Sequence, residues 1–205
     1  MSSERYQTEL PPPSRATLVM GLYGGLALVA LLLSAGRGDA NIYQLDEDVE
    51  SWRLLLSPIA GVALGLAVVA LSRVATARTT WGRELHQSFK HVLGPVTAKE
   101  IVILALASAI GEELMFRGAL LPWIGIVPQA ILFALLHIGP GRRFLPWTAS
   151  ALALGLACGV LVKITGDLGG VIAAHFTINF ANLRYIARVE LPPIGAAALP
   201  DPEQA

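Results

Sequence analysis

Residues 98–122 read AKEIVILALASAIGEELMFRGALLP, and no other part of the chain constrains its architecture as strongly. The run is apolar and long enough to cross a membrane, yet its second half carries Glu112, Glu113 and Arg117. On insertion scales, a charged side chain at the centre of a membrane helix costs roughly 2.5–3.5 kcal/mol. These side chains must therefore face a protein interior or a water-filled cavity. The segment predicts a bundle of helices around a polar centre.

The composition of the whole chain is that of an integral membrane protein. Of its 205 residues, 54% are hydrophobic and 15% are charged, and the mean hydropathy is +0.60. Soluble domains carry about 25% charged residues. The formal net charge is zero, and the basic residues lie between apolar runs rather than in a stripe, which argues against a nucleic-acid partner. The lone Cys158 lies in an apolar run and is interpreted as a small packing residue.

Apolar runs separated by turn signals predict an all-α fold, a polytopic transmembrane helical bundle of about six spans. The expected spans are residues 16–35, 52–71, 98–122, 126–138, 145–164 and 167–186. Thr97 and Glu100 form the pattern of a capping box at the start of the third span. Asp167 is expected to cap the sixth span. Gly61 and Gly65 in the second span favour close helix packing in lipid.

An amphipathic helix in the membrane interface is expected before the third span. Its apolar residues recur at helical spacing and are Trp81, Leu85, Phe89 and Val92. His86 and His91 are five residues apart, a poor spacing for two ligands, and are interpreted as solvated side chains. Residues 1–15 and 189–205 are expected to be disordered tails, and residues 16–188 to form one membrane-embedded domain.

The distribution of basic residues predicts the orientation in the membrane. Six spans place both termini on one side, and 11 of the 15 lysine and arginine residues fall on that side. The positive-inside rule then makes both termini cytoplasmic. We therefore expect a multi-pass protein of the cell membrane (inner or plasma membrane) that contacts the lipid bilayer. The sequence does not fix its oligomeric state.

The charged residues of the third span have different expected partners. Glu113 and Arg117 are four residues apart on one helical face, so we expect them to form an ion pair. Glu112 lies about 100° around the helix from Glu113 and cannot share that arrangement. It is left free to face a cavity as a general base or a metal ligand.

Further polar residues lie at matching depth in neighbouring spans. His137 follows Phe133 by four residues, and His175 and Asn179 are four apart on one helical face. At a rise of 1.5 Å per residue, Glu112, His137 and His175 lie about 15, 16 and 12 Å from the ends of their helices on the same, non-cytoplasmic side. One such histidine alone is often a packing residue. Their joint convergence near the middle of the bilayer favours a functional site, which the short helix at 126–138 would open to cytoplasmic water.

These residues resemble the three signatures of the CAAX-protease and bacteriocin-processing family of intramembrane peptidases, which includes the type II CAAX prenyl proteases. The family pattern is EExxxR, then FxxxH, then HxxxN or HxxxD, each on its own helix. The corresponding motifs here are Glu112-Glu113-x-x-x-Arg117, Phe133-x-x-x-His137 and His175-x-x-x-Asn179. They occur in the same order, and the resemblance covers about residues 80–188.

The resemblance implies an endopeptidase that hydrolyses a peptide bond of a membrane-associated substrate, such as a prenylated CAAX-like protein. Glu112 would be the general base that activates water, and His137 would hold that water or a metal ion. His175 and Asn179 would bind the water, the metal or the oxyanion.

The remaining implied roles concern orientation and a metal. Glu113 and Arg117 would orient Glu112 and the substrate backbone. Glu112, His137 and His175 are a set that could ligate one divalent metal, with zinc the first choice. A metal-free, glutamate-activated water is equally compatible with the same residues, so both mechanisms stay open.

Two other function classes stay open as well. One is a non-catalytic membrane protein with the same fold, acting in binding, in immunity to a peptide toxin or as a scaffold. The other is a proton- or ion-coupled transporter, since intramembrane Glu and His also form relays. The absence of an inverted repeat in the sequence argues against a transporter. Among proteases, the sequence contains neither H-E-x-x-H nor G-x-S-x-G.

Overall fold

The structure, a computed structural model, describes residues 14–39, 41–46, 48 and 50–192. Its elements are α1 (Arg15–Arg37), α2 (Ser51–Arg78), α3 (Thr80–Leu93), α4 (Ala98–Glu113), the π-helical stretch η1 (Leu114–Leu120), α5 (Leu121–Ile124), α6 (Ile126–Leu135), the short 3-10 helix η2 (Arg142–Phe144), α7 (Leu145–Thr165) and α8 (Gly169–Arg188). The predicted all-α class is confirmed. The predicted tails, residues 1–15 and 189–205, lie outside the described residues except for 14–15 and 189–192.

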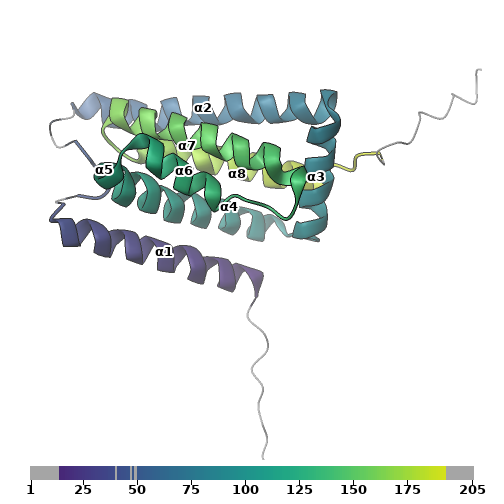
Figure 1. Cartoon of the computed structure of the whole chain (residues 1–205), viewed down its shortest axis with the longest axis horizontal. Coiled ribbons are helices and arrows are strands. Elements are labelled where there is room, and N and C mark those ends of the chain that lie inside the picture. Colours follow the sequence, from purple (N-terminus) through teal and green to yellow (C-terminus); the bar gives the residue numbers. More distant parts are fainter. Residues whose placement is uncertain (1–13, 40, 47, 49, 193–205) are drawn as a thin grey trace, which may run out of the picture.

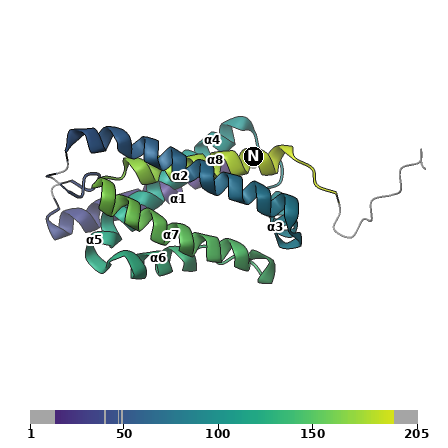
Figure 2. The same ribbon diagram turned by 90° about the horizontal axis from the view of Figure 1, so that it is seen from above.

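The long helices form a bundle, and α3 lies across one end of it (Figure 1, Figure 2). α8 packs against both α2 and α4, α6 packs against α7, and α1 packs against α4 and η1 at the edge of the bundle. α3 and the continuous helix α4–η1–α5 meet at 106°. α3 therefore crosses the end of the bundle at which α2 and α8 finish.

Three helical segments of the described chain are long and apolar enough to cross a membrane. They are α1, α2 and the segment Arg142–Thr165, which consists of η2 and α7. A fourth results if α3 and α4–η1–α5 are counted as one bent span. The chain is therefore a helical membrane protein, and the predicted number of six spans is not confirmed. α6 has 10 residues, which rise about 15 Å, half of the roughly 30 Å of hydrocarbon in a bilayer.

Glycines allow α2 to approach α8 closely. A Cβ atom at Gly61 would lie 1.8 Å from the carbonyl oxygen of Gly170, and one at Gly65 would lie 2.8 Å from Cβ of Thr177. Neither position has room for a larger residue, so the predicted packing role of these two glycines is confirmed. The close approach fixes α8, the helix that carries the third sequence motif.

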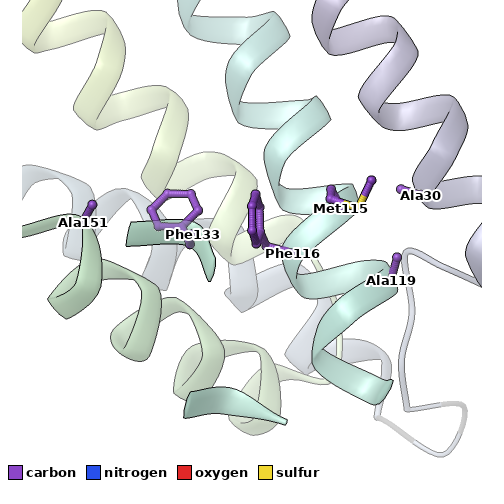
Figure 3. Close-up of a cluster of buried hydrophobic side chains, with 6 residues drawn as sticks. All are labelled: Ala30, Met115, Phe116, Ala119, Phe133 and Ala151. Atoms are coloured by element: carbon purple, nitrogen blue, oxygen red, sulfur yellow. The ribbon is translucent and has the colours of Figure 1, made fainter. Parts of the chain in front are cut away.

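A buried apolar cluster joins the helices that carry the first two motifs. Figure 3 shows its members, which are Ala30, Met115, Phe116, Ala119, Phe133 and Ala151. The rings of Phe116 and Phe133 meet edge to face, with centroids 5.1 Å apart and planes at 86°, a favoured aromatic geometry. Three members belong to η1, the wider π-helical stretch that directly follows Glu113. Such stretches inside α-helices occur frequently at functional sites.

The turn between α7 and α8 is fixed to the loop that follows α1. The backbone N–H of Leu168 donates to the carbonyl oxygen of Tyr43 at 3.0 Å. Asp167 Oδ1 accepts from Ser57 Oγ at 3.0 Å and from the N–H of Gly169 at 2.5 Å. The predicted N-cap position is wrong by one residue, because the N-cap of α8 is Leu168 and the helix begins at Gly169. Asp167 lies just before the cap and accepts from the first helical N–H. Burial, and secondly the Asp167 carboxylate, raise the pKa of the Tyr43 phenol.

Two predictions about histidines are wrong. α6 ends at Leu135, so His137 lies in the turn after the helix instead of inside a helix that runs to residue 138. The following Gly139 and Pro140 favour an early end, because proline disfavours the helical conformation of the residue before it. His86 is buried, and its Nε2 lies 3.1 Å from the carbonyl oxygen of Val189. That contact joins α3 to a segment about a hundred residues later, which periodicity cannot reveal.

Candidate active site

Glu112 lies where the three sequence motifs meet. Its Oε2 atom is 3.7 Å from Nε2 of His137 and 3.8 Å from Nε2 of His175. The Glu112 side chain is 11% exposed, and Oε2 is buried with no hydrogen-bond partner among the described residues. The structure therefore brings together three side chains from α4, α8 and the turn after α6, as their matching depths predicted.

Both histidines turn the same ring nitrogen toward Glu112. Nδ1 of His137 lies 2.7 Å from the carbonyl oxygen of Phe133, and Nδ1 of His175 lies 2.7 Å from Glu113 Oε1. A carbonyl or carboxylate oxygen only accepts, so each Nδ1 carries the hydrogen and donates it. In the neutral rings, each Nε2 is then an acceptor that faces Glu112. The tautomer of each ring is set by its second contact, a common arrangement for functional histidines.

Glu113 and Arg117 form the predicted ion pair, and the pair is completely buried. Arg117 Nη1 donates to Glu113 Oε1 at 2.9 Å, with side-chain exposures of 0% and 1%. The same Oε1 accepts from His175. The guanidinium carbon of Arg117 lies 4.5 Å from the ring centroid of Phe133, within the range of a cation–π contact. The ion pair thus fixes His175 through its Nδ1 atom, on the side of the ring away from Glu112. The spacing of the residues did not predict this link.

Asn179 lies on the same cavity but makes a different contact. Its Nδ2 donates to Ser108 Oγ at 2.9 Å. Asn179, Ser108, Glu112 and His137 all line a cavity of about 660 Å³, a size typical of small-ligand sites. The rest of the wall is mainly apolar, and most of it comes from α2, α3, α7 and α8. The site is therefore a polar corner at the side of an apolar cavity.

Three residues near this corner were missed by the sequence analysis. Trp147 packs against His137 with ring centroids 5.1 Å apart, and Ser108 bonds Asn179. Tyr23 of α1 lines the cavity together with Glu112. None of the three belongs to a motif. A weak signal existed for Ser108, which lies four residues before Glu112 and so shares its helical face.

The residues predicted as metal ligands come together without forming a ready ligand set. Among the described residues, no group of three or more His, Cys, Asp or Glu side chains is arranged to hold a metal ion. Ligand atoms about 2.0–2.2 Å from a tetrahedral zinc ion lie roughly 3.3–3.6 Å from one another. The separations of 3.7 and 3.8 Å around Glu112 Oε2 exceed that range. The excess is only 0.1–0.2 Å, so the metal site stays a prediction.

Comparison with known proteins agrees with the motifs. Residues 95–181 match the family described as type II CAAX prenyl endopeptidase, Rce1-like. This confirms the family resemblance for the segment that holds all predicted site residues. The chain is also 30% identical over 92 residues to an uncharacterized protein, YpbD, of Bacillus subtilis (strain 168), over 44% of this chain and 47% of that protein. The alignment thus spans about half of that relative, and no solved structure matches the chain.

Proposed function

We propose that this membrane protein is an intramembrane endopeptidase that uses Glu112 as the general base for an attacking water. The observation that carries the proposal is the convergence of Glu112 Oε2 with Nε2 of His137 and of His175, at 3.7 and 3.8 Å. All three atoms are hydrogen-bond acceptors when the rings are neutral. Acceptors that face one another in a buried site require a hydrogen donor or a positive charge between them.

A water molecule satisfies this requirement. A water that donates to two acceptors at about 2.8 Å each spans roughly 4.5 Å, so Glu112 and the histidine need to move apart by less than about 1 Å to hold it. One hydrogen goes to Glu112 and the other to a histidine Nε2, so a lone pair of the water oxygen is left for attack. The buried Oε2 favours this role, because a base is more effective where bulk water does not compete.

Hydrolysis then proceeds in two proton transfers. As the water oxygen bonds to the scissile carbonyl carbon, Glu112 takes one of its protons. When the tetrahedral intermediate breaks its C–N bond, that proton passes to the leaving nitrogen. Asn179 keeps a second Nδ2 hydrogen besides the one given to Ser108, and it donates this hydrogen to the oxyanion. Metal-assisted hydrolysis is the alternative to this route, and no step here depends on it.

Glu113 and Arg117 act one layer behind the reacting atoms. Glu113 Oε1 accepts from His175 Nδ1 at 2.7 Å, which fixes the tautomer that leaves Nε2 free toward Glu112. Arg117 holds Glu113 in place and neutralises its charge. Phe133 supplies a carbonyl oxygen to His137 Nδ1 and a ring that packs against it, with centroids 4.3 Å apart.

The shape of the cavity supports a membrane-associated peptide as the substrate. Its walls are mainly apolar, and α3 contributes Trp81, Leu85 and Phe89 to the end opposite α5. We place α3 in the membrane interface on the cytoplasmic side, with both termini in the cytoplasm and six membrane-embedded segments. The sequence supports this orientation through its basic residues. A prenylated CAAX-like peptide fits such a cavity because its lipid and its backbone need apolar and polar contacts together.

The test is cleavage by Glu112→Gln protein in proteoliposomes. A farnesylated peptide ending in a CAAX sequence and membrane proteins of the host serve as substrates, with products read by mass spectrometry. Loss of a general base lowers the rate by roughly 10²–10⁴-fold, whereas Glu50→Gln, at an exposed residue before α2, leaves it unchanged. Wild-type rates in the Glu112 variant would refute the proposal. If host cells that carry Glu112→Gln keep the wild-type phenotype although the variant cleaves no peptide, the non-catalytic binding or scaffold function would be favoured.

A further inference from the structure

Arg73 is the cationic residue of the active-site cavity. Of the described residues that line the cavity, Glu112 is the only aspartate or glutamate, and Arg73 is the only lysine or arginine. Arg73 is half-buried and belongs to the last turns of α2, which ends where α3 crosses the bundle (Figure 1). The cavity therefore has one acidic group at its polar corner and one basic group toward α3.

The guanidinium of Arg73 is held in one orientation. It donates to Asn182 Oδ1 at 2.8 Å and to the carbonyl oxygen of Ala181 at 2.9 Å. Its carbon lies 3.8 Å from the ring centroid of Tyr185, so one face of the guanidinium stacks on an aromatic ring. His86 of α3 packs edge-on against the same tyrosine, with centroids 5.2 Å apart. Contacts from α8 and α3 thus fix the position of the charge.

None of these contacts neutralises the charge of Arg73. No carboxylate of the described residues forms an ion pair with it. A neutral glutamine would make a comparable link from α2 to Asn182, and a charge without a counter-ion costs free energy in apolar surroundings. A merely structural link therefore does not explain the arginine. Two of its five N–H groups are used, and the remaining three are enough for a bidentate contact with a carboxylate.

α8 sets the distance between the basic group and the reacting atoms. Asn182, the partner of Arg73, follows His175 by seven residues, with Asn179 between them on the same helical face. At 1.5 Å per residue, Asn182 lies about 10 Å further along the helix than His175, the neighbour of Glu112. An extended peptide covers about 3.3 Å per residue, so roughly three residues connect the two positions.

We propose that Arg73 is a specificity-determining residue that binds a carboxylate of the substrate, about three residues from the bond that is cut. The carboxylate is either that of the peptide's C-terminus or that of an acidic side chain, because both offer the same planar pair of oxygens. The inference rests on the proposed function, since it names a chemical property of the substrate of that site. The apolar walls contact the residues between the two polar ends.

The first test compares cleavage of matched peptides. One farnesylated peptide carries a C-terminal carboxylate or a C-terminal amide, and a second, amide-terminated pair carries Asp or Asn three residues after the scissile bond. We expect wild-type kcat/KM to be roughly 10–100-fold higher for the anionic member of one pair, as for hydrogen bonds to a charged group. The pair that shows the preference identifies the source of the carboxylate.

Arg73→Gln should abolish this preference by lowering kcat/KM for the anionic peptide alone, and Arg73→Lys should keep part of it, because lysine retains the charge but not the fork. Arg78→Gln is the matched control, since Arg78 is exposed at the end of the same helix and does not line the cavity. An equal fall for the charged and neutral peptides in Arg73→Gln would mean a structural role and would overturn the proposal.

A second measurement does not depend on turnover. Peptide binding is measured in Glu112→Gln protein, with and without Arg73→Gln, by the fluorescence of Trp81 and Trp147, which both line the cavity. We expect Arg73→Gln to raise Kd for the anionic peptide roughly 10–100-fold and to leave Kd for its neutral counterpart unchanged. Equal Kd values for the anionic and neutral peptides of both pairs in Glu112→Gln protein would contradict the inference.

The two measurements separate this inference from the proposed function. If binding shows a preference that depends on Arg73 while the wild type cleaves no peptide, the carboxylate site stands and the protease function fails. If Glu112→Gln abolishes cleavage while Arg73→Gln keeps the wild-type preference, the function stands and the role of Arg73 is refuted. If Arg73→Gln weakens only the binding of phosphatidylglycerol, measured by native mass spectrometry, the guanidinium serves a lipid phosphate and the inference is again refuted.

Discussion

The ion pair between Glu113 and Arg117 should be strongly coupled, and this can be measured by a double-mutant cycle. The two side chains are 1% and 0% exposed and meet at 2.9 Å. Arg117→Met leaves the Glu113 carboxylate buried with His175 as its remaining donor. Glu113→Gln leaves the buried guanidinium of Arg117 without its carboxylate. Two of its nitrogens already have no hydrogen-bond partner among the described residues. Removing one member of such a pair is expected to destabilise the protein by roughly 3–5 kcal/mol.

The expected size of the effect follows from the length of the chain. For a protein of about 200 residues, each kcal/mol shifts Tm by roughly 2–4 °C, so either single substitution should lower Tm by roughly 6–20 °C. The double variant Glu113→Gln/Arg117→Met removes both charges and should lose much less than the sum. We expect a coupling energy of roughly 2–3 kcal/mol.

Thermal unfolding in detergent, followed by tryptophan fluorescence, is the assay. The control is Glu190→Gln, which removes the partner of Lys90 from a pair whose glutamate is 84% exposed. Exposed pairs contribute about 1 kcal/mol or less, so this variant should stay within about 4 °C of the wild type. Additive losses in the double variant, or single losses as small as that of Glu190→Gln, would refute the reasoning that the pair is buried and mutually dependent.

Two further predictions concern packing and metal. Gly61→Ala should lower Tm clearly, because its Cβ would lie 1.8 Å from the Gly170 carbonyl oxygen. Gly24→Ala is the control and should leave Tm unchanged, because no atom lies within 4 Å of the new Cβ. Equal Tm values in the two variants would show that α2 and α8 are not in close contact. Elemental analysis of purified wild type and His137→Ala should show whether a metal is bound. Stoichiometric zinc lost in the variant would make metal-assisted hydrolysis the leading mechanism, and no metal in either folded protein would favour the water activated by Glu112 alone.

Much of the polar centre was predictable because its residues obey local rules. The i, i+4 spacing of Glu113 and Arg117 predicted their ion pair. The count of 1.5 Å per residue predicted that Glu112, His137 and His175 would lie at one depth, and their side chains do meet. Each of these rules depends only on the geometry of a single helix.

The parts that were not predicted depend on contacts between distant segments. The end of α6 at Leu135 puts His137 in a turn, where Thr148 Oγ1 donates to its carbonyl oxygen at 2.7 Å. His86 is buried by Val189, which follows α8. Tyr23 lines the same cavity as Glu112, and its backbone approaches α4 closely because Gly111 has no side chain. Hydrophobic periodicity describes one helix at a time, so it contains no information on which helix end or neighbouring backbone will cover a given residue.

The geometry also explains how two adjacent glutamates can have different tasks. His175 lies between them, with Nδ1 at 2.7 Å from Glu113 and Nε2 at 3.8 Å from Glu112. Glu113 is neutralised by Arg117 and has no exposure from which to meet a substrate. Glu112 lines the cavity, and no arginine or lysine pairs with it among the described residues. One carboxylate therefore fixes the imidazole, and the other is free to act as the base in the proposed mechanism. Exchanging their partners would require α4 to rotate by about 100°, which the close contact of Gly111 with Tyr23 prevents.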